Sequence, residues 1–179
     1  MDKHAGIEKI LVSQEQLKVR IKEIAAQLDK DYAGERPIVV CILKGSFLFF
    51  ADLVREMNIP LMVDFIEASS YGNGTVSSGK LNITKDLTAN IKGKHVLLVE
   101  DIVDSGNTLS ALKKHLLTRG PESVKIVTLL DKKARRSVPV EVDYTCFQIA
   151  DEFSVGYGLD YAGEYRNLPY IGCLSHTQL

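Results

Sequence analysis

The sequence predicts an α/β protein with an open, mainly parallel, twisted sheet flanked by helices. Two segments, Ile38–Leu43 and His95–Val99, are apolar, β-branched-rich and too short for helices, which is typical of strands buried on both faces. Each is followed by a short turn and then by apolar residues at helical spacing. Because strand and helix alternate along the chain, we expect parallel strands joined by right-handed crossovers.

The first predicted element is an amphipathic helix after Ser13. Ser13 and Gln16 have the spacing of a capping box, and Val12 with Leu17 fits the hydrophobic staple that flanks such a box. Apolar residues then recur at helical spacing, namely Leu17, Ile21, Ile24 and Leu28.

A second helix is expected after the Ile38–Leu43 strand, which Lys44-Gly45-Ser46 interrupts. Its apolar positions are Phe47, Phe50, Ala51 and Val54. Leu61–Ala68 is the next predicted strand, and Leu81–Thr84 is predicted to return beside it as a hairpin. The long tip, Ser69–Gly79, is rich in glycine and serine and cannot bury a core, so we expect a mobile loop there.

The second half of the chain continues the alternation. A helix with apolar positions at a 3.6-residue period should follow His95–Val99 and stop at Gly120-Pro121. Val124–Leu130 and Tyr144–Ile149 are the last predicted strands, and a basic turn, Lys132–Arg136, lies between them.

Length and charge restrict the function classes. A chain of 179 residues without a linker predicts a single domain, residues 1–179. With 22 basic and 23 acidic residues and no basic block, binding to nucleic acid or to a membrane surface is not expected. The longest apolar run, Ile38–Leu43, is far shorter than the roughly 20 residues that span a bilayer, and the N-terminus lacks a secretory apolar region. We therefore expect a cytoplasmic protein.

Candidate site residues follow the His95–Val99 strand, and in open α/β sheets ligands bind where strand carboxyl ends meet helix N-termini. Glu100 and Asp101 come directly after the strand, although an acidic pair alone is more often a solvated strand end. Asp104–Thr108 is a polar turn entering a helix, whose backbone N–H groups and hydroxyls can converge on an anion, although such a turn is structural about as often. Together these residues suggest a phosphorylated sugar as ligand, with the phosphate in the turn and the ribose hydroxyls on the carboxylates.

The segment Val99–Leu109, VEDIVDSGNTL, resembles the phosphoribosyl-pyrophosphate (PRPP) signature of the type I phosphoribosyltransferases. Four further segments resemble one branch of that family, the bacterial hypoxanthine (hypoxanthine-guanine) phosphoribosyltransferases: Leu43–Ser46, Ser69–Gly72, Leu129–Lys132 and Asp151–Tyr161. The resemblance extends from about Ile38 to Gly172. It implies the type I fold, with a core over about 10–150, a small hood from the N-terminal segment and about 151–179, and a flexible active-site loop.

The resemblance implies an activity in purine salvage. Members transfer the 5-phosphoribosyl group from PRPP to N9 of hypoxanthine or guanine with Mg²⁺, giving inosine or guanosine monophosphate (IMP or GMP) and pyrophosphate. A phosphoribosyltransferase for xanthine or a pyrimidine is one alternative. A non-catalytic PRPP-binding regulator is another, but it would be expected to carry a DNA-binding segment or a basic RNA face. Members are commonly dimers or tetramers, and the apolar run Phe47–Phe50 fits either an interface or the core.

Several positions correspond to the PRPP side of the family's site. Asp104 matches the catalytic carboxylate that faces purine N7, whereas from the residues alone it could be a helix N-cap. Glu100, Asp101 and Asp160 match carboxylates that bind the metal, its waters or the ribose hydroxyls, and Lys44 matches a residue that contacts pyrophosphate through a cis peptide after Leu43. The residues expected to bind PRPP and its phosphates are Lys44, Gly45, Glu100, Asp101, Asp104, Ser105, Gly106, Asn107, Thr108 and Arg166.

The purine side is also implied by the resemblance. Lys132 matches the lysine that bonds the 6-oxo group, and an ammonium, having donors only, disfavours a 6-amino group. Phe153 matches the aromatic that stacks on the base, and Val155 the residue whose backbone faces the base edge. Without the resemblance, Lys132 would be read as a solvated charge, as would Asp160 and Arg166, and Phe153 as a core residue. The residues expected at the purine are Lys132, Phe153, Val155 and Asp160, and those in the flexible loop are Ser70 and Tyr71.

Overall fold

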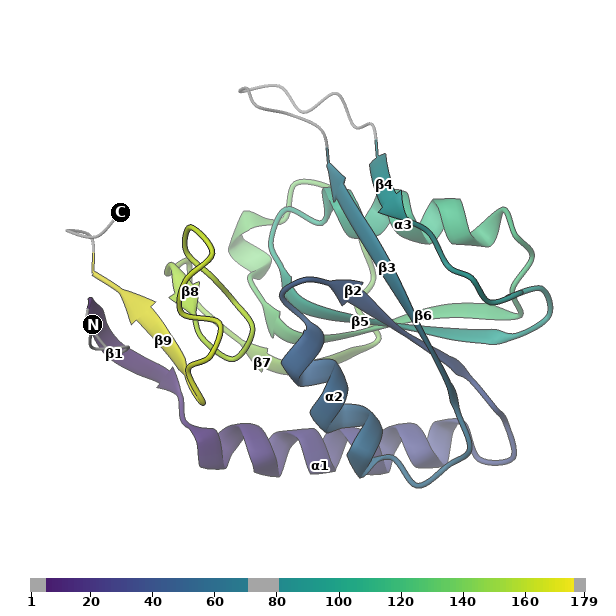
Figure 1. Ribbon diagram of the computed structural model, residues 1–179, viewed down its shortest axis with the longest axis horizontal. Helices are drawn as coiled ribbons and strands as arrows, with labels where there is room; N and C mark the ends of the chain where they lie inside the picture. Colours follow the sequence, from purple (N-terminus) through teal and green to yellow (C-terminus); the bar gives the residue numbers. More distant parts are fainter. Residues whose placement is uncertain (1–5, 71–80, 176–179) are drawn as a thin grey trace.

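The computed structural model describes residues 6–70 and 81–175. Its centre is a six-stranded sheet with the order β4-β3-β2-β5-β6-β7 (Figure 1). The strands are β2 Ile38–Leu43, β3 Met62–Ser70, β4 Leu81–Lys85, β5 His95–Val103, β6 Ser123–Asp131 and β7 Tyr144–Gln148. Five neighbouring strands are parallel and only β4, at one edge, is antiparallel, which confirms the predicted fold class.

Helices cover both faces of this sheet. α1 (Gln14–Asp31) and α2 (Phe47–Glu56) lie on one face and α3 (Asn107–Leu117) lies on the other (Figure 1). Alternate residues of the central strands therefore enter two cores: in β2, Val39 and Cys41 pack toward α1 and α2, while Val40 and Ile42 pack toward α3. Burial on both faces explains why the β2 sequence is continuously apolar.

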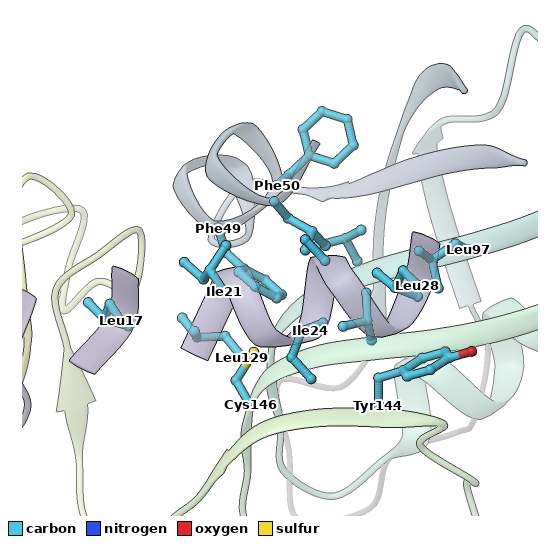
Figure 2. Close-up of a cluster of buried hydrophobic side chains, with 14 of the residues drawn as sticks. Leu17, Ile21, Ile24, Leu28, Phe49, Phe50, Leu97, Leu129, Tyr144 and Cys146 are labelled. Atoms are coloured by element: carbon cyan, nitrogen blue, oxygen red, sulfur yellow. The ribbon is translucent and has the colours of Figure 1, made fainter. Parts of the chain in front are cut away.

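The start of α1 agrees with its sequence pattern. The Gln16 amide donates to Ser13 Oγ over 3.2 Å, and the Ser13 amide donates to Gln16 Oε1 over 2.8 Å, so the predicted capping box is present. Figure 2 shows the apolar side of α1 against side chains from α2, β5, β6 and β7. The α1 residues in this cluster that the figure labels are Leu17, Ile21, Ile24 and Leu28.

A second sheet was not predicted as strands. β1 (Ile7–Val12), β8 (Ser154–Val155) and β9 (Ile171–Leu174) form a three-stranded antiparallel sheet in the order β1-β9-β8. It lies at one end of the molecule (Figure 1) and includes the pair Ile10 and Gly172, which are far apart in the sequence. Strands this short, whose partners are distant, leave no clear periodicity.

The end of β5 and the hairpin β3–β4 need comparison with the predicted boundaries. β5 continues to Val103 instead of ending at Val99, because β6 keeps pairing alongside it, so Glu100 and Asp101 are strand residues. β3 and β4 form the predicted hairpin, whose tip, with Tyr71, lies outside the described residues. Within residues 6–70 and 81–175, no helix has the length and apolar character needed to cross a membrane.

Candidate active site

A cavity of about 430 Å³ opens at the carboxyl ends of β2, β3 and β5. Its walls come from the turn after β2, from the segment joining β5 to α3, and from the loop 156–168. Its polar and glycine lining residues are Lys44, Gly45, Ser69, Glu100, Asp101, Asp104, Ser105, Gly106, Thr108, Asp160 and Arg166. All of the residues expected to bind PRPP line it except Asn107.

The turn expected to bind phosphate lies at the N-terminus of α3. Gly106 is the N-cap with a φ of 83°, a left-handed conformation that glycine adopts without a steric penalty. Gly106 has no side chain to cap the helix, and although the Asn107 amide donates to Ser105 Oγ over 3.4 Å, the following N–H groups of the first turn of α3 remain available to an anion. Asp104 is therefore not an N-cap, which removes that alternative. Asn107, which does not line the cavity, donates from Nδ2 to Ser105 Oγ over 3.2 Å and so stabilises the turn.

Two carboxylates lie beside this turn. Glu100 and Asp101 both line the cavity, although successive strand residues face opposite sides. Burial and the adjacent negative charge of Asp101 raise the pKa of Glu100 well above its usual value. Asp101 Oδ1 accepts from the Ile102 amide over 2.7 Å. A Cβ at Gly45 would lie 1.6 Å from Asp101 Oδ2, so a larger residue at the turn after β2 would displace the Asp101 side chain.

The donor set around the cavity fits Mg²⁺. Glu100, Asp101 and Asp160 present carboxylate oxygens to one cavity, and oxygen is the ligand that Mg²⁺ prefers. Among residues 6–70 and 81–175, no group of three or more acidic, histidine or cysteine side chains is gathered closely enough to hold a metal by itself. That arrangement suits an ion bound through one or two carboxylates, water and substrate phosphates.

The opposite wall is the loop 156–168. Arg166 Nη2 pairs with Asp160 Oδ1 at 2.7 Å, and Arg166 Nη1 donates to the Gly158 carbonyl over 2.6 Å, so both charges are partly buried at the cavity and the solvated-surface alternative is wrong. A Cβ at Gly158 would lie 2.0 Å from the Gly45 carbonyl oxygen, so this loop packs directly on the turn after β2. The peptide bond before Lys44 is cis, as the family resemblance implied.

Of the residues expected at the purine, Asp160 lines the cavity, whereas Lys132, Phe153 and Val155 do not. Lys132 follows β6 and is only 5% exposed, so it is not a solvated charge. Its amide donates to the Val103 carbonyl over 3.0 Å, and its Nζ is not among the buried polar atoms that lack a partner in the described parts of the chain. Phe153 is 39% exposed rather than part of the core and packs edge-on against Tyr161, whereas Val155 is fully buried.

Sequence reasoning missed Arg135, which belongs to the basic turn (3₁₀ helix Lys133–Arg135). Arg135 Nη1 lies 3.6 Å from Asp104 Oδ2, and its Nε lies 3.6 Å from Asp151 Oδ1. The other carboxylate oxygen, Asp104 Oδ1, is buried with no hydrogen-bond partner within the described residues. The adjacent Arg136 donates from Nε to the Asp104 carbonyl over 3.2 Å. In the sequence, only the pair of arginines shortly after Lys132 could have indicated a cation near Asp104.

The fold and this cavity define a protein class: an open parallel α/β domain with an anion-binding turn, adjacent strand carboxylates and a cationic opposite wall. Residues 9–162 match the family model of the phosphoribosyl transferase domain. A hypoxanthine-guanine phosphoribosyltransferase of Streptococcus pneumoniae is 55% identical over 168 residues, which are 94% of this chain and 93% of that protein.

Two further relatives indicate the same family. A crystal structure of a hypoxanthine phosphoribosyltransferase from Staphylococcus aureus superposes with a TM-score of 0.93 at 46% identity, covering 96% of this chain and 94% of that one. The bifunctional protein TilS/HprT of Listeria innocua is 52% identical over 171 residues, and the chain spans about a quarter of its length. The chain belongs to the phosphoribosyltransferase family of pentosyltransferases, in the branch of the bacterial hypoxanthine-guanine enzymes.

Proposed function

We propose that this protein transfers the 5-phosphoribosyl group of PRPP to N9 of hypoxanthine or guanine, yielding IMP or GMP and pyrophosphate in purine salvage. The observation that carries the proposal is the single cavity that combines the turn Asp104–Thr108, the carboxylates Glu100 and Asp101, and the wall formed by Lys44, Gly45 and Arg166. The names of the relatives support the same reaction.

Each wall suits one part of PRPP. The free N–H groups at the start of α3, with the hydroxyls of Ser105 and Thr108, would bind the 5-phosphate. Glu100 and Asp101 would accept from the ribose hydroxyls or from metal-bound water. Lys44 and Arg166 would offset the charge that gathers on departing pyrophosphate. Mg²⁺ bound there would neutralise phosphate charge in the same way.

Asp104 would exchange a proton with the purine at N7 as N9 becomes the nucleophile. Its Oδ1 is buried without a partner among the described residues, which is unusual for a carboxylate unless a ligand completes it. Arg135, 3.6 Å from Oδ2, would hold the side chain in place from the opposite side.

Lys132 would select 6-oxopurines. Lys132 is 5% exposed, so its surroundings hold the side chain in place, and its ammonium would donate to a 6-oxo group. Phe153, half exposed at the edge of the same region, would stack on the base, and the Val155 backbone would face its edge. Of the two residues expected in a flexible loop, Ser70 is instead the last residue of β3, and Tyr71 lies outside the described residues.

We also propose a cytoplasmic homodimer or homotetramer without nucleic-acid or membrane partners. Of the run Phe47–Phe50, Phe49 and Phe50 are buried in the core, whereas Phe47 is 40% exposed. Val63 and Phe65 on β3 are also exposed, because α2 leaves that end of the sheet uncovered. Exposed large apolar side chains of this kind suit a contact between subunits.

The decisive test is a spectrophotometric assay with PRPP, Mg²⁺ and one base at a time. Hypoxanthine and guanine should turn over, and adenine should not. Turnover of xanthine or a pyrimidine alone would move the protein to another branch of the family. No turnover with any base, combined with PRPP binding in a calorimeter, would identify a non-catalytic binder.

A further inference from the structure

Tyr157 occupies an unusual position beneath the loop 156–168. Its side chain is 7% exposed, and its hydroxyl donates to the carboxylate of Asp52 on α2. Burial, and then the bond to Asp52, raise the pKa of the Tyr157 hydroxyl, so it remains a neutral donor. The reaction proposed above assigns no role to either residue.

The backbone around Tyr157 is held in a rare conformation. Gly156, Tyr157 and Gly158 have φ values of 96°, 51° and 102°, all in the left-handed region. A residue with a Cβ is disfavoured there, so its surroundings must maintain this geometry. The Tyr157 amide donates to the Leu168 carbonyl over 2.9 Å, and the side chain is anchored at Asp52.

This anchor connects the two walls of the cavity. Asp52 is on α2, which starts at Phe47, directly after the Lys44-Gly45-Ser46 turn. The residue after Tyr157 is Gly158, whose carbonyl accepts from Arg166 Nη1 and whose amide donates to the Arg166 carbonyl over 2.9 Å. This hydrogen bond between Tyr157 and Asp52 therefore joins the helix behind Gly45 to the loop that presents Arg166, in addition to the direct packing of Gly158 on Gly45.

We propose that the Tyr157–Asp52 hydrogen bond is a positioning contact that sets the separation between the Lys44-Gly45 wall and the Asp160-Arg166 wall, and so sets affinity for the pyrophosphate end of PRPP. This inference rests on the proposed function. Tyr157 touches no substrate in this scheme and acts through Arg166 and Asp160. Losing the bond should therefore weaken PRPP binding and leave recognition of the purine base intact.

The chain offers a matched control. Tyr144, labelled in Figure 2, is 5% exposed and donates through its hydroxyl to Asp31 Oδ2 on α1 over 2.7 Å. Tyr157→Phe and Tyr144→Phe thus remove the same kind of bond between a buried tyrosine and a helix aspartate. Neither tyrosine lines the cavity, but Tyr144 is bonded to α1, which contributes no lining residue, so its loss reports on stability alone.

The measurements are KM for PRPP and for hypoxanthine, calorimetric binding of PRPP with Mg²⁺, and thermal unfolding. Tyr157→Phe should raise both KM and Kd for PRPP about tenfold through misplacement of one wall. The KM for hypoxanthine should stay within about twofold. Tyr144→Phe should change neither constant while lowering thermal stability to a similar extent.

Substitutions of Asp52 test the same bond from its other end, on a side chain that is 37% exposed and so tolerates change if Tyr157→Phe fails to fold. Asp52→Ala should weaken PRPP binding as Tyr157→Phe does. Asp52→Asn should weaken it less, because the amide keeps an oxygen acceptor. The double variant Tyr157→Phe with Asp52→Ala should bind PRPP no more weakly than either single variant.

Equal losses for PRPP and hypoxanthine, or identical behaviour of the Tyr157 and Tyr144 variants, would overturn the inference. PRPP binding is read separately from turnover, so a protein that binds PRPP but transfers nothing would refute the proposed reaction and still test the contact. An unmodified protein that does not bind PRPP would overturn both.

Discussion

Replacing Lys132 by alanine should weaken turnover of 6-oxopurines selectively. Lys132 as a whole residue is only 5% exposed, so solvent screens its charge little. A hydrogen bond from a charged donor to purine O6 contributes about 1.5–3 kcal/mol, which corresponds to roughly a 10- to 150-fold change in rate. Adenine has no acceptor at position 6 and should lose almost nothing.

The assay is a one-pot competition between hypoxanthine and adenine at limiting PRPP. We expect kcat/KM for hypoxanthine to fall about 10- to 150-fold, with adenine affinity, read as competitive inhibition, changed less than about twofold. Lys132→Met keeps most of the side-chain volume and should show the same selective loss, which separates the missing hydrogen bond from a cavity effect.

The neighbouring Lys133 is exposed and provides the control. Lys133→Ala removes the same charge from the same turn and should change neither kcat/KM for hypoxanthine nor the affinity for adenine. An equal fall for both bases in Lys132→Ala would mean that Lys132 acts on pyrophosphate or on folding, and its assignment to the 6-oxo group would be wrong.

Other substitutions test the remaining parts of the site. Asp104→Asn should lower kcat by about 10²–10⁴ while calorimetry shows PRPP binding retained, because the amide keeps the size but cannot exchange the proton; a loss below about tenfold would refute its catalytic role. Gly45→Ala should weaken PRPP binding, since its Cβ would displace the Asp101 carboxylate from its position in the cavity, and calorimetric affinity equal to the unmodified protein would contradict that geometry. Sedimentation should show a species larger than the monomer mass of about 20 kDa, and Phe65→Lys on the exposed strand face should shift it toward monomer; a monomer at micromolar concentration would reject assembly.

Local chemistry determined the predictions that succeeded. The capping box at Ser13 and the buried strand Ile38–Leu43 depend on neighbouring residues and short periodicities, which one sequence displays. The turn Asp104–Thr108 was readable for the same reason, because a polar turn entering a helix presents N–H groups regardless of the rest of the fold. The family resemblance then supplied the residues that have no local signature, such as Lys132 and Arg166.

Only the tertiary structure decided what depends on distant partners. β1 and β9 pair across most of the chain length, so nothing near Ile7 indicates a strand. β5 reaches Val103 because β6 pairs beside it, and Lys132 is buried by its surroundings although it stands in a basic turn. The link between Tyr157 and Asp52 joins residues 105 positions apart. Such contacts depend on how elements distant in sequence pack together, and the free energy that stabilises them cannot be read from one segment of the chain.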